Sequence, residues 1–206
     1  ASSKAYKIVR SETNNPGSFE EIGIATVTGT TPVLYNDHTA LTNSKSYYYK
    51  MIDVDSCGFD GLETNIGRTM LLTAISNNEQ FTNILTWNDY EIWSGTLSSY
   101  NIYRGIDGVM DPAPIANVPF TGGVNTYVDD INSLLIGQGV FSYYVEALEG
   151  TGNIYGFAEN SISNIAEAYQ DPLIYIPNAF VPLGEDGRNE IFLPVTTFVD
   201  FKEYEF

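Results

Sequence analysis

The sequence has one cysteine, one histidine and few basic residues, and each shortage excludes a class of protein. The lone Cys57 cannot form an internal disulfide, so the fold has to be stabilised by packing. A single histidine and a single cysteine give poor support to a zinc site. The 9 Lys and Arg against 26 Asp and Glu give a formal net charge of -17. Because this charge repels phosphate backbones and anionic headgroups, we expect no nucleic acid and no lipid surface as a direct partner.

Long apolar runs are also missing from the sequence. No stretch approaches the roughly 18 consecutive apolar residues that cross a bilayer, so we expect no direct membrane insertion. Residues 1–4 (Ala-Ser-Ser-Lys) lack the charged and apolar regions of a signal peptide. We therefore expect any export signal to lie upstream.

The residues that are abundant favour strands over helices. The chain of 206 residues is 43% hydrophobic, which is enough for one large or two small domains. Its 15 Tyr and 11 Phe suit a pleated, half-buried surface, and Ala and Leu do not dominate. We therefore expect an all-β fold.

A long internal repeat runs through the chain. Residues 6–10 (Tyr-Lys-Ile-Val-Arg) return as residues 100–104 (Tyr-Asn-Ile-Tyr-Arg), an offset of 94 positions. The next aromatic strand repeats at the same offset, with Tyr47, Tyr49 and Met51 matching Phe141, Tyr143 and Val145. A unit of this length is too long for a solenoid repeat and suits one autonomous β-sandwich of about 100 residues.

Other landmarks of the repeat drift by small amounts. Residues 35–37 (Tyr-Asn-Asp) match residues 127–129 (Tyr-Val-Asp) at an offset of 92, and residues 63–65 match residues 159–161 at an offset of 96. Loop-length changes produce such drifts. The chain is therefore expected to carry tandem modules.

The order of these elements resembles a fibronectin type III domain over roughly residues 71–170. The resemblance depends on a Trp in the second strand, a Tyr-x-Ile-x-Arg strand, a Tyr-x-Asp segment and a Tyr-x-Val-x-Ala strand closed by a Gly turn. It implies a complete antiparallel sandwich of seven strands. The residues expected to share its core are Trp87, Tyr100, Ile102, Tyr143 and Val145. Alternation over residues 81–90 predicts a strand that turns Asn83, Leu85 and Trp87 to one face. Further strands are expected near residues 100–105, 113–120, 126–132, 140–149 and 155–167.

The first module is expected to be incomplete. Too few residues precede Tyr6 to hold the first two strands or their Trp. A sandwich without one sheet exposes the inner face of the other. This exposure costs about 25 cal/mol of stability per Å² of apolar surface. We expect that residues 1–70 do not fold alone, and that the polypeptide extends upstream or is a fragment held by something else.

A short stretch near the end of the chain carries the strongest family resemblance. Residues 175–182 (Tyr-Ile-Pro-Asn-Ala-Phe-Val-Pro) lead into an acidic Gly turn and a Phe. This order resembles the opening of the gliding-motility-associated C-terminal domain, the type B sorting domain of type IX secretion cargo. The matching residues are Pro177, Asn178, Ala179, Phe180, Pro182, Gly184, Asp186, Gly187, Asn189 and Phe192.

The match to the sorting domain departs from the family pattern at three places. Leu183 replaces the turn Asn, residues 185–186 hold two acids where one Asp is usual, and Glu190 replaces the second acid. The resemblance covers only residues 173–206. It implies recognition by the type IX translocon and its outer-membrane shuttle proteins, and a protein that is secreted or held on the cell surface.

The predicted fold class is therefore all-β: tandem immunoglobulin or fibronectin type III-like antiparallel sandwiches, with the start of a further sandwich at the C-terminus. Residues 1–70 form the incomplete module and residues 71–171 the complete one. Residues 172–206 form the N-terminal part of the sorting domain.

Catalytic constellations are poorly represented. His38 follows Asp37, but neighbouring residues on a strand point to opposite faces, which is poor geometry for a triad. Cys57 lies among acids and no Gly-x-Ser-x-Gly elbow is present. We expect that the chain is not an enzyme.

Acidic turns raise the alternative of a calcium site. The best placed acids are Glu185, Asp186 and Glu190, although none of the acidic clusters has the spacing of an EF-hand loop. The competing interpretation is a turn in which carboxylates bond backbone amides and no metal binds. We expect no other cofactor.

Exposed aromatic side chains would be needed for a carbohydrate platform. Trp93 lies between two strands and is the candidate expected to be exposed, with Tyr90, Tyr103 and Tyr155 as further aromatics. The sequence thus allows a cell-surface or polysaccharide ligand.

Our main functional hypothesis is a non-catalytic stalk with a C-terminal secretion-signal region. Two alternatives remain: spacer modules of an extracellular polysaccharide-degrading enzyme, and an adhesin whose sandwiches bind a ligand directly.

Overall fold

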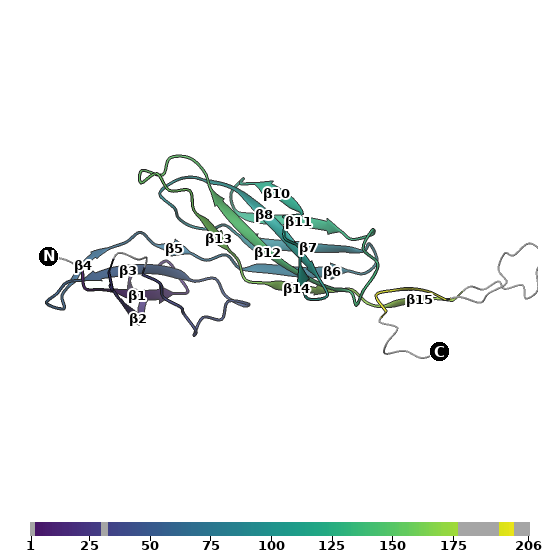
Figure 1. The fold of residues 1–206 in the computed structure, drawn as a ribbon, viewed down its shortest axis with the longest axis horizontal. Helices are drawn as coiled ribbons and strands as arrows, with labels where there is room; N and C mark the ends of the chain where they lie inside the picture. Colours follow the sequence, from purple (N-terminus) through teal and green to yellow (C-terminus); the bar gives the residue numbers. More distant parts are fainter. Residues whose placement is uncertain (1–2, 30–32, 177–193, 200–206) are drawn as a thin grey trace, which may run out of the picture.

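The computed structural model describes residues 3–29, 33–176 and 194–199. These residues form antiparallel sheets, which confirms the predicted all-β sandwich fold. Two β units lie one after the other, and a small hairpin follows the second (Figure 1). We call residues 3–70 unit one and residues 71–171 unit two. No helix in the described part of the chain is long and apolar enough to cross a membrane.

Unit one contains one sheet among its described residues. The strand order is β2-β1-β3-β4, and the short β5 also pairs with β3. The elements are β1 (Ala5–Ser11), the 3-10 turn η1 (Pro16–Ser18), β2 (Glu20–Thr26), β3 (Tyr48–Val54), β4 (Asp60–Glu63) and β5 (Gly67–Arg68).

Unit two contains two sheets. One has the order β11-β7-β6 and the other β10-β8-β12-β13, with β14 pairing with β12 and β9 with β8. The strands are β6 (Leu72–Asn77), β7 (Thr82–Asn88), β8 (Leu97–Ile106), β9 (Val109–Met110), β10 (Ala116–Pro119), β11 (Val124–Asp130), β12 (Val140–Glu149), β13 (Asn160–Ile162) and β14 (Ala166–Tyr169).

The last strand expected in unit two is divided into β13 and β14. Between them, Asn164 leaves the ladder and bonds the backbone of the other sheet. Its Oδ1 accepts from Leu72 N at 2.7 Å, and its Nδ2 donates to Leu72 O at 3.0 Å. This side chain fastens the edge of one sheet to the other, so the predicted single strand becomes two.

The two sheets of unit two enclose one core. The five residues predicted to share it, Trp87, Tyr100, Ile102, Tyr143 and Val145, are at most 1% exposed and lie in the same cluster. Inward and outward residues alternate along β7, as the sequence pattern indicated. The rings of Trp87 and Tyr100 meet edge to face, with centroids 5.4 Å apart. The predicted core is thus confirmed.

The sheet of unit one matches the larger sheet of unit two. Strands β2-β1-β3-β4 have the same order as β10-β8-β12-β13. Ile8 is paired with Met51, and Ile102 with Val145, so both partners shift by the 94 residues of the sequence repeat. The repeat therefore marks equivalent positions in three dimensions.

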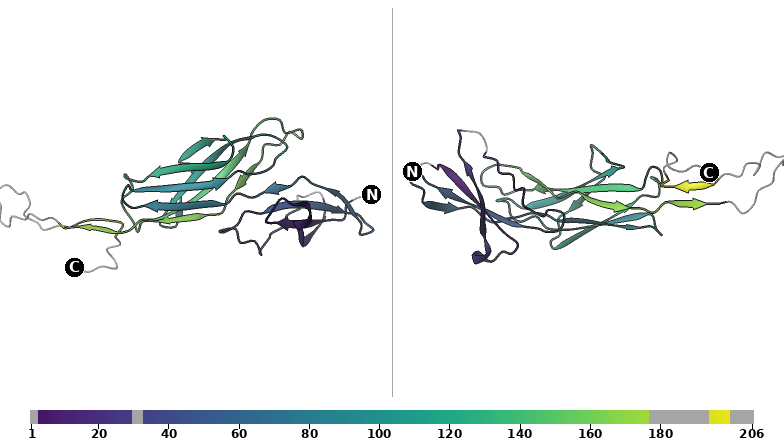
Figure 2. Two further views of the ribbon diagram at one scale, coloured as in Figure 1. Left: turned by 180° about the vertical axis from the view of Figure 1, so that it is seen from behind. Right: turned by 90° about the horizontal axis from the view of Figure 1, so that it is seen from below.

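The units are joined end to end without a spacer (Figure 2). Arg68 of β5 forms an isolated bridge with Glu91, and its Nη1 lies 3.1 Å from Glu91 Oε1. Asn65 Nδ2 donates to Ile92 O at 2.9 Å. These contacts tie the end of unit one to a loop of unit two.

A hairpin of β15 (Leu173–Tyr175) and β16 (Val195–Thr197) follows unit two. Phe198, directly after β16, is 4% exposed and belongs to the core of unit two. A side chain at Gly139 would meet Gln170 O at 2.7 Å and Phe198 Cβ at 3.0 Å, and Gly139 has φ +74. Only glycine suits this contact, which seats Phe198 at the end of the sandwich.

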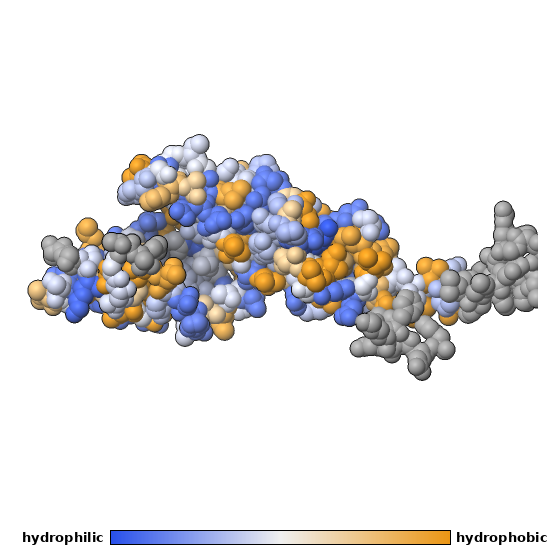
Figure 3. Space-filling view, in the orientation of Figure 1, coloured by the Kyte–Doolittle hydropathy of each residue, from blue (hydrophilic) through white to orange (hydrophobic). Residues whose placement is uncertain are grey.

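On the face shown in Figure 3, hydrophobic residues lie in small groups between hydrophilic ones over both units. Among the large apolar side chains that are exposed are Ile24 of unit one and Val109 of unit two. Isolated exposed apolar residues are normal for a soluble surface.

Candidate functional site

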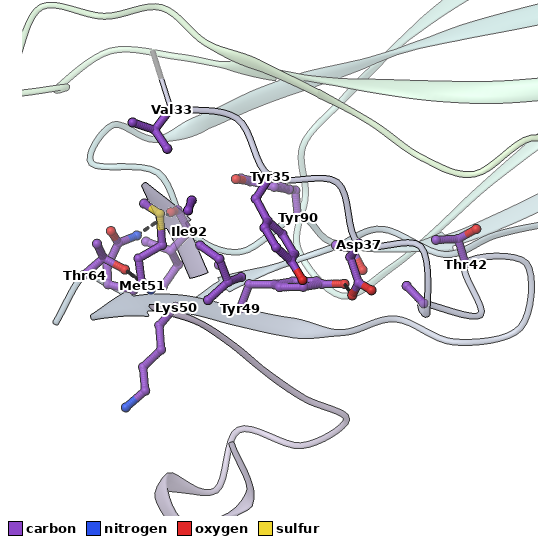
Figure 4. Close-up of a pocket in the computed structure, with 16 residues that line it drawn as sticks. Val33, Tyr35, Asp37, Thr42, Tyr49, Lys50, Met51, Thr64, Tyr90 and Ile92 are labelled. Carbon is purple, nitrogen blue, oxygen red and sulfur yellow. Dashed lines mark hydrogen bonds between the residues drawn. The ribbon is translucent and has the colours of Figure 1, made fainter. Parts of the chain in front are cut away.

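A groove lies over the sheet of unit one. It is a cavity of about 610 Å³ whose floor includes Ile8, Tyr49 and Met51. Tyr35 and Asp37 rise along its side, and Tyr90 and Ile92 of unit two also line it. Figure 4 shows Tyr35, Tyr49 and Asp37 together at its centre, while the Lys50 side chain points away from them. The lining is mainly apolar, and of its charged residues Lys50 points away while Asp37 is turned into the groove.

The charged group in the groove is fully engaged with its neighbours. Asp37 Oδ2 accepts from Arg10 Nη1 at 2.6 Å and from Tyr49 Oη at 2.8 Å. Its Oδ1 accepts from Thr39 N at 2.9 Å and Thr39 Oγ1 at 2.8 Å. Arg10 also lies over the Tyr47 ring, 4.6 Å from its centroid. This cluster holds the segment that carries Asp37 against the sheet.

Unit two contains the same cluster in its interior. Arg104 Nη1 donates to both oxygens of Asp129 at 2.9 and 3.0 Å, and Tyr143 Oη donates to Asp129 Oδ2 at 2.7 Å. Asp129 is 4% exposed. These three residues are the repeat equivalents of Arg10, Asp37 and Tyr49, so the two units share a polar cluster as well as a strand order.

Burial and hydrogen bonds shift the pKa of Asp37, Tyr49 and Tyr143. Burial raises the pKa of Asp37, but hydrogen bonds from Thr39, Tyr49 and Arg10 outweigh burial and lower it to about 2. Burial and the neighbouring carboxylate raise the pKa of Tyr49. Burial and Asp129 likewise raise the pKa of Tyr143. Tyr49 is therefore a neutral donor to an ionised Asp37 at physiological pH.

The segment over the groove differs from its equivalent in unit two. Residues 127–129 lie in β11, whereas residues 33–40 form no strand. The Tyr35 side chain packs against β2, where its Oη donates to Ile22 O at 2.6 Å. A Cβ at Gly23 would lie 2.4 Å from this Oη. A glycine is thus needed at residue 23 for the ring to approach the strand.

The aromatic residue expected to be exposed is half-buried. Trp93 packs against the core of unit two, and its ring centroid lies 4.3 Å from that of Tyr90. The expectation that Trp93 is exposed is therefore wrong, because the loop between β7 and β8 folds back on the sandwich. Tyr155 is 70% exposed and lies beside Phe157, which is 60% exposed, with centroids 6.3 Å apart. The sequence had not singled out Phe157.

Tyr103, the remaining aromatic candidate, packs on the outer surface of the larger sheet. It stacks on Tyr144 at 4.5 Å with an interplanar angle of 9°. Its Oη donates to Glu146 Oε2 at 3.2 Å, and Asn101 and Asn160 also donate to Glu146. The polar side chains around Tyr103 are thus hydrogen-bonded to a single shared acceptor, Glu146.

The residues weighed for catalysis are not brought together. Asp37 is bonded to Arg10, Tyr49 and Thr39. The strand geometry expected around His38 is wrong, because residues 33–40 form no strand. Cys57 is an exposed free cysteine.

Acidic turns in the described residues use their carboxylates to bond the backbone. Asp55 Oδ1 accepts from Cys57 N at 2.8 Å and Phe59 N at 2.9 Å. No group of three or more His, Cys, Asp or Glu within residues 3–29, 33–176 and 194–199 could hold a metal. The calcium candidates Glu185, Asp186 and Glu190 lie outside those ranges.

The secretion-signal motif also lies outside the described residues, since its members fall within residues 177–193. This holds for Pro177, Asn178, Ala179, Phe180, Pro182, Gly184, Asp186, Gly187, Asn189 and Phe192.

Comparison with known proteins adds no relative: no protein-family model matches the sequence, and no curated protein matches it significantly.

Sequence reasoning missed two features near the candidate sites. One is the groove, which is lined by β1, β3, the segment with Asp37, and Tyr90 and Ile92 of unit two. The other is the burial of Phe198 in unit two. The offset between residues 35–37 and 127–129 was the signal that could have located the first. The sequence around Phe198 gave no comparable signal.

Proposed function

We propose that this chain is a non-catalytic stalk of an exported protein, leading into a C-terminal secretion-signal region. The observation that carries the proposal is the duplication. Units one and two repeat one strand order, one register and one Arg-Asp-Tyr cluster, and they are joined without a spacer. Tandem sandwiches with short connections are suited to holding other parts of a protein at a distance, because a short connection limits relative motion.

The modules of the stalk are fibronectin type III-like in this proposal. Support comes from unit two, where a sheet of order β11-β7-β6 faces one of order β10-β8-β12-β13. Further support comes from Trp87 in the second strand of that unit, which lies at the centre of its core.

The C-terminal region is proposed to be the start of a type B sorting domain. The ordered run from Pro177 to Phe192 is its only support, together with its place after the two modules. The implied partners are the type IX translocon and its outer-membrane shuttle proteins. The implied location is outside the outer membrane, either secreted or on the cell surface.

Export of a reporter tests this function. The segment from residue 172, with the native sequence that follows it, is fused to a fluorescent protein carrying a periplasmic signal peptide in a cell with type IX secretion. We expect the reporter in the medium or on the surface. The matched control scrambles residues 177–192 and should remain periplasmic. A native fusion that also stays periplasmic would refute the proposed signal.

A second candidate function is adhesion. The exposed Tyr155 and Phe157 in the loop between β12 and β13 favour it, because stacked aromatics can form a platform for a sugar ring. Pull-down of the full chain on insoluble polysaccharides tests it. Binding that is lost in a Tyr155→Ala, Phe157→Ala double variant would favour adhesion, and equal binding of both proteins would exclude this loop.

A further inference from the structure

The sheet of unit one has one face that its counterpart in unit two does not expose. Tyr100, Tyr143 and Val145 are 0% exposed beneath the smaller sheet of unit two. Their repeat equivalents are Tyr6, Tyr49 and Met51. Of these, Met51 is 41% exposed, and the other two are partly exposed. Equivalent positions on equivalent strands thus differ because the second sheet is present over one unit and not over the described part of the other.

Part of the missing cover is already present in unit one. Asp129 lies on β11, and Asp37 occupies the same place relative to its Arg and Tyr. The segment with Asp37 therefore stands where β11 stands in unit two. The parts without a counterpart in the described residues are β6 and β7, which form one antiparallel hairpin.

The absence of that hairpin explains why residues 33–40 form no strand. In unit two, β11 pairs with β7 and with no other described strand. Without a counterpart of β7, the segment around Asp37 has no ladder to join, although its sequence matches that of β11. A strand beside it would give its backbone groups the ladder partners that β7 gives to β11.

The side chains of β7 show what the groove would receive. Trp87 lies against Tyr100, and Asn83 Nδ2 donates to Tyr143 Oη at 2.7 Å. The space above Ile8 and Met51 is the cavity of about 610 Å³. Arg10 and Asp37 already form an ion pair with each other, so an occupant of the groove does not have to supply a charge. An alternating strand with a large apolar residue fits the cavity.

We propose that the groove is the seat of an antiparallel β-hairpin built like β6–β7, supplied by polypeptide that leads into β1. The repeat fixes its register: Ala5 pairs with Val54 as Ser99 pairs with Leu148, so residue 98 corresponds to the position just before Ala5. The hairpin pairs with residues 33–40, converts them to a strand and covers Tyr49 and Met51.

A graft into the full chain tests the proposal. A copy of residues 71–98 replaces residues 1–4, so that the copied hairpin and its natural connection lead into β1. The matched control is the same graft with the copies of Leu85 and Trp87 replaced by Ser, so that its inward face can no longer fill the groove with apolar side chains. Backbone hydrogen exchange and binding of a hydrophobic fluorescent dye are measured on the unmodified chain, the graft and the control.

We expect the amides of residues 33–40 to be protected at least tenfold in the graft, and dye binding to fall several-fold. The control graft should resemble the unmodified chain. Asp53 stands where unit two has Ala147, so adding Asp53→Ala to the graft should increase the protection. These changes would not depend on whether the C-terminal region directs export.

Two results would overturn the proposal. One is a graft whose residues 33–40 exchange as fast as those of the unmodified chain while β12 of unit two stays protected, which shows an intact fold with an empty groove. The other is sedimentation of the unmodified chain as a dimer with these residues protected. A second copy, and not a hairpin, would then be the occupant.

Discussion

At the scale of single residues, Asp37 and Asp129 occupy equivalent positions of the repeat and accept equivalent hydrogen bonds in different surroundings. Each accepts hydrogen bonds from an Arg and a Tyr and so holds the segment that carries it against a sheet. Asp129, on the smaller sheet of unit two, is buried against the larger sheet, whereas Asp37 lines an open groove. A charged hydrogen bond of this kind contributes more to stability than a neutral one.

Replacing Asp37 should weaken unit one in a pH-dependent way. Its pKa is about 2 in the folded chain against 3.8 as the ordinary value. The stabilisation, about 2 kcal/mol, is therefore complete above pH 3.8 and is lost as the pH falls through about 2. We expect Asp37→Asn to lower protection of β1 and β3 in hydrogen exchange at pH 7 and to have little effect near pH 2. An equal effect at both pH values would contradict this assignment.

Trp87 should be the most costly single residue to truncate in unit two. Its side chain is 1% exposed at the centre of the core, so Trp87→Ala leaves a cavity and should lower the free energy of unfolding by about 3 to 5 kcal/mol. Urea unfolding followed by circular dichroism measures the loss. Ile75→Ala, at a position 65% exposed on β6, is the matched control and should change stability by about 0.5 kcal/mol or less. Equal losses would mean that Trp87 is not a core anchor.

The residue scale also shows where sequence reasoning succeeds. Alternation predicted the inward face of β7, and the repeat placed Tyr100, Tyr143 and Val145 in one core. Sequence reasoning failed for Trp93, because the alternation of residues along a strand does not show how a loop folds back on a sheet. Burial of a loop residue depends on tertiary contacts that local sequence does not encode.

At the scale of elements, β12 was predicted within its observed bounds, Val140–Glu149, whereas the last strand of unit two was not. Long strands can be recognised in a sequence from the regular alternation of apolar and polar residues. The division into β13 and β14 depends on one side chain, Asn164, that bonds the opposite sheet. The segment around Asp37 also has the sequence of a strand without being one, because strand formation needs a partner.

The hairpin of β15 and β16 should depend on Phe198 for its attachment to unit two. The Phe198 ring lies 6.0 Å from Phe141 and 6.4 Å from Phe81, measured between centroids. Phe198→Ala should cost about 3 kcal/mol in the stability of unit two and speed hydrogen exchange in β16. Leu173→Ala, on the same hairpin at a position 46% exposed, should do neither. Unchanged exchange in the Phe198 variant would show that the hairpin is held by other contacts.

At the scale of the whole molecule, two units follow one another and the hairpin continues from the second (Figure 1). The chain passes from the sheet that contains β5 to the sheet that contains β6 between residues 68 and 72. Residues on the two sides of position 172 pack together, because Phe198 lies in the core of unit two. Sequence repeats locate modules well, but they do not show which later residues fold back onto an earlier module.

The central claim of this account is that the chain is a stalk exported across the outer membrane. The most direct measurement places an epitope tag after Gly152, in the loop between β12 and β13, and adds protease to intact cells of the source organism. The account predicts that the epitope is detected in the medium or on intact cells, and that the protease removes any epitope on intact cells. It further predicts that deleting the chain from residue 172 onward leaves the epitope inside and protected. An epitope found only after lysis in the undeleted protein would contradict the claim.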